Sequence, residues 1–202
     1  MAQAERAEDH AIVATLTRAF FDDPLFNFFT PDLVRQMRGL LAFMGAAYVD
    51  ARPFGNVWVA HTNDAKVAGA AVWLPPGAYP RNSRREAMTY LRGLPSFARV
   101  GRRLAATVRL LNELDKAHHD ATGPHFYLEI LGVDPLYQRT GAGSAVLQPV
   151  LEQCDTEGLG AYLETQKPEN VPWYGRHGFD LVQEMDIQDC PPIWTMLRQP
   201  RA

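Results

Sequence analysis

Two glycines separated by one residue carry the most chemical information in this sequence. Gly141 and Gly143 follow an apolar stretch that ends at Val133, and they precede residues with helical spacing. The run therefore predicts a strand, a short loop and the first turn of a helix. The start of a helix leaves backbone N–H groups unpaired and carries partial positive charge. Because glycine has no side chain, an anion can approach those donors closely, and the pattern predicts a phosphate-bearing ligand.

Several readings of this loop compete. A Walker-type phosphate loop requires a lysine after its last glycine, and Ser144 stands there instead. A dinucleotide fingerprint requires a third glycine where this chain has Val146, although Glu164 supplies the acid expected further on. Too little chain follows the loop for a doubly wound sheet. The pyrophosphate of coenzyme A needs the same helix start without the third glycine, and an ordinary strand-to-helix turn without a ligand is the remaining alternative.

The residues around and after the glycines resemble a known family. Residues 138–143, Gln-Arg-Thr-Gly-Ala-Gly, are similar to the Gln/Arg-x-x-Gly-x-Gly/Ala signature of the GNAT acetyltransferase superfamily. Residues 170–179, Asn-Val-Pro-Trp-Tyr-Gly-Arg-His-Gly-Phe, resemble the Asn-x-x-x-Tyr-x-x-x-Gly-Phe segment of that family. A closer resemblance, to the puromycin N-acetyltransferase branch, runs through residues 57–60, 71–73, 163–165 and 194–196.

The resemblance implies the GNAT fold, a mixed and mostly antiparallel α/β sheet flanked by helices, and acetyl-CoA as cosubstrate. It also implies that the backbone of Leu131 and Val133 pairs with the pantetheine amides like an added strand. Arg139 suits a phosphate through its fixed charge. Asn170 stands at a predicted helix start, where asparagine caps well, and the resemblance adds a contact to the cofactor arm. The predicted cofactor-binding residues are Leu131, Val133, Gln138, Arg139, Thr140, Gly141, Ala142, Gly143, Ser144 and Asn170.

Three side chains are candidates for the proton transfers that acetylation of an amine requires. An alkylammonium has a pKa near 10.4, so a base must remove its proton, and the departing thiolate benefits from a donor. Tyr174 is the predicted donor, because a phenol is neutral at pH 7 and the family's tyrosine matches this position. Glu129 and Glu164 compete as the base, and a water route independent of both is the third alternative.

The strand predicted over 125–133 positions these groups. Its even positions Phe126, Leu128 and Ile130 should form one apolar face, which leaves Glu129 on the other. Residues 25–29 are predicted as an aromatic connection, and a helix break is expected near residues 93–95. Helices are predicted over 8–21, 32–50, 83–93, 95–118 and 143–157, and further strands over 56–61, 66–73, 161–164, 179–186 and 193–198.

Bulk composition restricts the remaining classes. The chain has 202 residues, 47% apolar and 21% charged, which predicts one soluble domain over 1–202. No apolar run has membrane-spanning length and the N-terminus has no signal core, so no membrane partner and a cytoplasmic location are expected. Residues 118–120, His-His-Asp, have no matching ligand cluster, so no metal is predicted. Eight arginines within 81–110 against the single acid Glu86 favour a solvated helical face over nucleic-acid binding.

These patterns together predict an acetyl-CoA-dependent N-acetyltransferase. Direct transfer to the primary amine of a small molecule is expected, and the resemblance points to an aminonucleoside antibiotic as one acceptor class. A monomer or a homodimer is expected. Two alternatives from other classes are a non-catalytic acyl-CoA-binding or sensory domain and an NAD-binding oxidoreductase.

Overall fold

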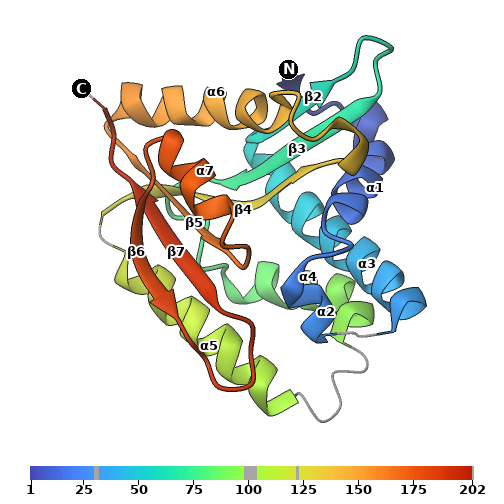
Figure 1. The fold of residues 1–202 in the computed structure, drawn as a ribbon, viewed down its shortest axis with the longest axis vertical. Helices are drawn as coiled ribbons and strands as arrows, with labels where there is room; N and C mark the ends of the chain where they lie inside the picture. Colours follow the sequence, from blue (N-terminus) through green and yellow to red (C-terminus); the bar gives the residue numbers. More distant parts are fainter. Residues whose placement is uncertain (30–31, 98–103, 122, 202) are drawn as a thin grey trace.

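The computed structural model describes residues 1–29, 32–97, 104–121 and 123–201, with only the backbone described at 94–97, 104 and 120. Its described strands form a seven-stranded sheet in the order β1-β2-β3-β4-β5-β7-β6 (Figure 1). Neighbouring strands are antiparallel except β4 and β5, which are parallel. The strands are β1 Ala2–Gln3, β2 Val57–His61, β3 Val67–Leu74, β4 His125–Val133, β5 Gly160–Thr165, β6 Asp180–Met185 and β7 Ile193–Arg198. The sheet is therefore mixed and mostly antiparallel, as predicted.

Helices cover both faces of this sheet. The described helices are α1 Asp9–Ala19, α2 Pro24–Phe29, α3 Leu33–Ala51, α4 Ser83–Phe97, α5 Leu104–Asp120, α6 Ala142–Glu157 and α7 Asn170–Arg176, with short 3-10 turns at Arg6–Glu8, Arg52–Phe54 and Pro135–Tyr137. Helix α6 lies along one face, whereas α1 and α3 lie on the other (Figure 1). Helix α5 packs on the same face as α1 and α3, through Leu110. None of the described helices is long and apolar enough to cross a membrane.

Helical periodicity explains how the α6 layer closes its core. Val146, Val150 and Cys154 recur four residues apart on α6 and are fully buried against the sheet. The helix continues without interruption through Pro149. Burial of these side chains fixes the start of α6 against the ends of the central strands, which is where the predicted ligand loop lies.

Strand β4 carries one extra residue in its middle. Val72 of β3 pairs with Ile130 and Trp73 pairs with Leu128, so Glu129 has no partner of its own on β3 and forms a β-bulge. Phe126 and Leu128 pack in the α6 cluster, whereas Ile130 packs in the α1 and α3 cluster. The prediction that these three even positions share one face is therefore wrong beyond Leu128, because the bulge shifts the side-chain alternation by one residue.

Two helix boundaries also differ from prediction. Residues 25–29, predicted as a connection, belong to α2: Asp23 accepts the N–H of Leu25 through its Oδ1 at 2.9 Å, and Pro24 occupies the first helical position. Helix α4 runs through residues 93–95 to Phe97, so the break predicted there is wrong. Loss of one N–H donor at Pro95 does not end the helix, and the interval between α4 and α5 falls at residues 98–103, outside the described part of the chain.

Candidate functional site

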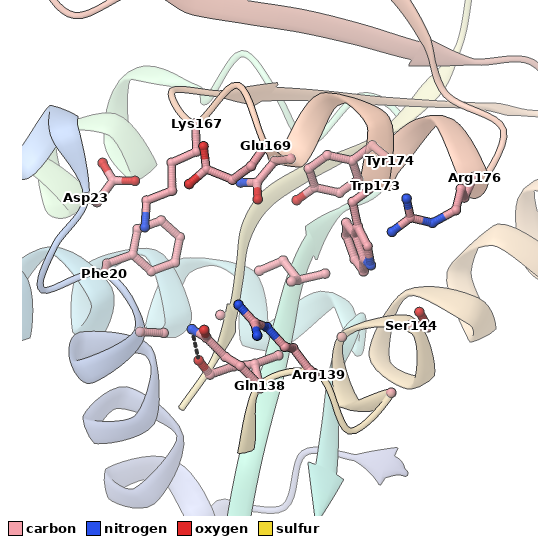
Figure 2. Close-up of a pocket in the computed structure, with 17 residues that line it drawn as sticks. Phe20, Asp23, Gln138, Arg139, Ser144, Lys167, Glu169, Trp173, Tyr174 and Arg176 are labelled. Atoms are coloured by element: carbon pink, nitrogen blue, oxygen red, sulfur yellow. Dashed lines mark hydrogen bonds between the residues drawn. The ribbon is translucent and has the colours of Figure 1, made fainter. Parts of the chain in front are cut away.

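The central parallel strands part in the middle of the sheet. Their pairing runs from His125 with Gly160 to Leu128 with Leu163, and β4 then continues to Val133 paired only with β3. The N–H of Asp134, the residue after Val133, donates to the carbonyl oxygen of Ala68 on β3 at 2.9 Å. Backbone groups alternate along a strand, so those of Leu131 and Val133 point away from β3 into the gap left by β5. The carbonyl of Val133 accepts there from the side-chain amide of Gln138 at 3.4 Å (Figure 2).

A cavity of about 570 Å³ opens at this gap. Most of the predicted cofactor-binding residues line it, together with the predicted donor: Leu131, Val133, Gln138, Arg139, Gly141, Gly143, Ser144, Asn170 and Tyr174. Thr140 and Ala142 do not line it. Thr140 instead closes the loop by donating its hydroxyl to the carbonyl of Tyr137 at 2.7 Å. Residues that are far apart in the sequence thus meet around one opening.

The two glycines at the start of α6 serve different purposes. Gly141 precedes the helix with φ of 89°, a left-handed conformation that favours glycine. Its carbonyl accepts the N–H of Ala145 at 3.0 Å, so the amides of residues 142–144 precede the helical hydrogen-bond ladder. A Cβ on Gly143 would lie 3.2 Å from Cζ2 of Trp173 on α7. The second glycine therefore permits α7 to approach the helix start closely, a reason that the sequence did not reveal.

Cationic side chains surround the cavity. Arg139 lies in the left-handed region with φ of 63°, and its guanidinium points into the cavity (Figure 2). Lys167 and Arg176, just before and at the end of α7, add two further cations, against the acids Asp23 and Glu169. Lys167 and Arg176 are not among the residues predicted from the sequence; the available signal for them was a basic residue just before, and another within, the segment that resembles the family. Helix-start amides beside three cations fit a ligand with several phosphate groups. The unpaired edge of β4 fits a ligand that also carries an extended chain with amide groups, because such a chain can hydrogen-bond to the edge like an added strand.

Tyr174 faces the cavity from α7. It is 6% exposed, and its ring packs edge-on against Trp173 and Phe179, with ring centres 4.8 and 5.7 Å away. Its hydroxyl points toward the cavity (Figure 2). Burial raises the pKa of Tyr174 well above the usual value for a phenol. The side chain therefore keeps its proton across the physiological range and can donate it in a hydrogen bond.

Asn170 does not cap α7. It is the first residue of the helix, and its side-chain amide donates to the hydroxyl of Thr165 at 2.9 Å. The capping interpretation of Asn170 is therefore wrong, because its side chain bonds to Thr165 instead of a backbone N–H of α7. The observed bond ties the start of α7 to the end of β5 and leaves Asn170 lining the cavity.

Glu129 lies outside this cavity and forms part of a buried ion network. It accepts from Arg81 at 2.5 Å, and Arg81 also donates to Asp50 at 2.7 Å. Asp50 accepts two further bonds from Arg85. Arg81 and Arg85 are therefore ion-paired inside the protein, and the prediction of a solvated arginine face is wrong for these two. Exposure of Arg84, Arg92 and Arg109 fits that prediction.

The second oxygen of Glu129, Oε2, is buried without a hydrogen-bond partner among the described residues. The side chain is 10% exposed. Burial raises the pKa of Glu129, and the charge of Arg81 opposes that rise. One carboxylate oxygen is thus held by an arginine, and the other is free to accept a proton or a donor.

Glu164 lies near Glu129, directly after Leu163, the last residue of β5 that pairs with β4. Its side chain is 9% exposed, and Oε1 lies 3.9 Å from Nδ1 of His118 on α5. Burial raises the pKa of Glu164 to about 7, and the nearby hydroxyls of Tyr127 and Tyr162 oppose the rise. Each acid is therefore the first residue of its strand beyond the segment over which β4 and β5 pair with each other. Neither acid lines the cavity that Tyr174 faces.

Comparison with known proteins places the chain in a family. The sequence model of the Acetyltransferase (GNAT) family matches residues 24–179, and the chain belongs to this family. The protein is therefore an N-acetyltransferase. Its sheet contains a single parallel pair within the described residues, unlike the doubly wound sheet that an NAD-binding oxidoreductase would need.

Relatives carry the same assignment. An uncharacterized N-acetyltransferase of Schizosaccharomyces pombe, C550.08, is 27% identical over 203 residues, covering 94% of this chain and 78% of the relative. A crystal structure described as histone acetyltransferase HPA2 and related acetyltransferase, from Corynebacterium glutamicum, superposes with a TM-score of 0.71 at 22% identity, over 100% of this chain and 96% of that one. Arylalkylamine N-acetyltransferase 2 of Aedes aegypti gives a TM-score of 0.66 at 14% identity, over 99% and 98%. These two structures share the fold of this chain.

Proposed function

We propose that the protein transfers the acetyl group of acetyl-CoA directly to the primary amine of a small molecule. One observation carries this proposal. A cation-lined cavity at a helix start and two buried carboxylates occupy the two sides of the gap where β4 and β5 part. A thioester held in the cavity would present its carbonyl to an amine that arrives beside Glu129 and Glu164.

The residues of the cavity support acetyl-CoA as the cosubstrate. Gly141 and Gly143 expose the first amides of α6 to the pyrophosphate, and Arg139, Lys167 and Arg176 supply positive charge for the phosphates. Leu131 and Val133 direct backbone groups that β5 does not pair toward the pantetheine arm, and the side chain of Gln138 holds the carbonyl of Val133 at 3.4 Å. Bound in this way, acetyl-CoA would supply an acetyl group activated as a thioester.

Glu164 and Glu129 have different roles toward the amine. An alkylammonium with a pKa near 10.4 is almost fully protonated at pH 7 and must lose a proton before it attacks. Glu164, whose pKa is raised to about 7, is matched to receive that proton near neutral pH. Glu129 is held by Arg81 and would attract the incoming ammonium through its free oxygen. On the opposite side, Tyr174 donates to the departing sulfur.

The acceptor class is supported by two further features. Three tyrosines, Tyr79, Tyr127 and Tyr162, gather around His118 on the side of the two acids, which suits an amine that carries an aromatic group. The arylalkylamine enzyme of Aedes aegypti shares the fold, and residues 163–165 resemble the puromycin branch. We propose a small aromatic amine, with an aminonucleoside as the specific example to test.

Thiol release from acetyl-CoA tests the proposal. The protein is incubated with acetyl-CoA and a panel of arylalkylamines, polyamines and an aminonucleoside, and each amine is paired with its hydroxyl analogue. We expect thiol release and N-acetylated product with at least one aromatic amine, and none with the hydroxyl analogues. In parallel, acetyl-CoA should raise the melting temperature and NAD should not. Binding of acetyl-CoA without turnover of any amine would instead support an acyl-CoA sensor.

A further inference from the structure

Two histidines connect Glu164 to the end of the central strands where β4 begins, away from the cavity. His118, near the end of α5, places Nε2 at 3.2 Å from Nε2 of His125 at the start of β4. Nδ1 of His125 lies 2.9 Å from the carbonyl oxygen of Gly123. His118 is 6% exposed and its Nδ1, which lacks a hydrogen-bond partner among the described residues, faces Glu164 at 3.9 Å. His125 is half-buried and Gly123 is exposed. The four groups form a line from a buried carboxyl group to the surface.

The hydrogen-bond partners determine which nitrogens carry protons. A carbonyl oxygen only accepts, so Nδ1 of His125 must donate to Gly123. In neutral His125 the other nitrogen, Nε2, is then an acceptor, and His118 must donate to it from its own Nε2. Nδ1 of His118 is consequently a bare lone pair that faces Glu164. Burial together with His125 lowers the pKa of His118 to about 3, so this ring is neutral at rest.

When Glu164 is protonated, its carboxyl group can donate a hydrogen bond to the lone pair on Nδ1 of His118. We propose that His118 and His125 form a proton relay that carries the proton received by Glu164 out to the solvent. The Glu164 hydroxyl gives its proton to Nδ1 of His118 while the Nε2 proton of His118 passes to Nε2 of His125. His125 becomes an imidazolium and releases its Nδ1 proton to water. A reverse hop along the same line would return the proton to Glu164, so each ring recovers its first tautomer by turning out of the line and exchanging through water, which takes the new N–H proton and supplies one to the other nitrogen. One proton leaves Glu164 and one reaches water.

Both ends of this transfer keep the internal hydrogen bonds of the line satisfied. Before it, Glu164 donates to His118 and His118 donates to His125. After it, His118 donates from Nδ1 to the Glu164 carboxylate, and His125 donates to both His118 and Gly123. The 3.9 Å separation has to shorten, which a small side-chain movement or one bridging water accomplishes, and such bonds are often long without substrate.

Burial separates Glu164 from the solvent and from the cavity. Glu164 is almost completely buried, and the cavity with its phosphate-binding residues lies on the other side of the gap. The titratable groups that face the two histidines are Tyr79 from the segment after β3, Tyr127 from β4, and Tyr162 and Glu164 from β5. Two further acids lie behind these tyrosines: Asp115 of α5 accepts from Tyr79, and Glu129 of β4 acts on Tyr127. Burial or neighbouring acids raise the pKa values of all three tyrosines, so these phenols stay neutral and do not compete for the proton.

Histidine NMR on the wild-type protein tests the geometry without reference to turnover. Long-range ¹H–¹⁵N spectra distinguish the two neutral tautomers, and His118→Gln and His125→Ala assign the signals. At pH 7 we expect both rings to be neutral, with the single N–H proton of His125 on Nδ1 and that of His118 on Nε2. The opposite pair of tautomers would overturn the relay, whatever the enzyme acetylates.

Kinetics test the transfer itself, which rests on the proposed role of Glu164. His125→Ala should lower kcat by roughly 10- to 100-fold, leave KM for acetyl-CoA unchanged and regain activity with added imidazole. His119→Ala, at the exposed neighbouring histidine on α5, is the matched control and should behave as wild type. Full activity and an unshifted pH profile in His125→Ala, or a loss that imidazole does not rescue, would overturn the relay. Failure of the proposed function is distinct, since the wild type itself would then acetylate no amine.

Discussion

At the scale of single residues, Tyr174 holds its hydroxyl in a fixed position facing the cavity, where it can donate a proton. Aromatic packing fixes its ring, and burial keeps it protonated. We expect Tyr174→Phe to lower kcat by roughly 100-fold, because a lost general acid costs about that much. The Kd for acetyl-CoA should stay within about twofold, because the ring remains. Steady-state kinetics and calorimetry measure the two quantities, and Tyr90→Phe on the exposed face of α4 serves as the control. Unchanged turnover would remove Tyr174 from the mechanism.

Glu164 couples folding to pH. The folded protein holds the Glu164 proton up to about pH 7, whereas the unfolded chain releases it near pH 4.5. The stabilisation is therefore fully present below pH 4.5 and lost as the pH rises to about 7, by about 3 kcal/mol. Glu164→Gln should abolish this dependence and also the activity limb near pH 7. Urea unfolding of both proteins at pH 5, 6 and 8 measures the difference. A wild-type stability that falls no more steeply than that of the variant would contradict the burial effect.

At the scale of secondary-structure elements, the start of α6 and the helix α7 form the cavity together. Gly143 permits their close approach, since its Cβ would lie 3.2 Å from Trp173. Gly143→Leu should push the indole away and block the helix-start amides, and should weaken acetyl-CoA binding by at least roughly tenfold. Gly175→Leu on α7 is the control, because a Cβ there meets open space. Retention of acetyl-CoA affinity in Gly143→Leu, measured by calorimetry, would place the phosphates elsewhere.

The bounds of β4 were predictable from the sequence, whereas the bulge made it impossible to predict which side chains share a face of the strand. The bounds of β4 match the predicted 125–133 because apolar residues recur at the even positions Phe126, Leu128 and Ile130 in a segment that ends at a turn. The extra residue at Glu129 is set by pairing with β3, and it reverses the alternation for every residue after it. The same bulge lies where β5 leaves β4, so one local irregularity both opens the gap and places an acid beside it.

At the scale of the whole molecule, Arg81 joins parts of the chain that are remote in sequence. It bridges Asp50 at the end of α3 and Glu129 on β4, and its side chain is only 12% exposed. Arg81→Met would leave two buried carboxylates close together with only Arg85 to compensate them. We expect a loss of about 3–5 kcal/mol in the free energy of unfolding. Arg84→Met, at an exposed neighbour, should change it by less than about 0.5 kcal/mol in the same urea titrations. Equal effects of the two variants would mean that the network contributes nothing.

The sequence by itself determined the features that depend on near neighbours along the chain. The loop with Gly141 and Gly143, the bounds of β4 and β7 and the apolar stripe of α6 follow from turn chemistry and side-chain periodicity. Tyr174 became a candidate through the resemblance of residues 170–179 to the family. Tertiary structure alone decided that Glu129 and Glu164 lie opposite Tyr174, and that His118 meets His125. Strand register and long-range ion pairs depend on segments that come together only on folding, so no local pattern encodes them.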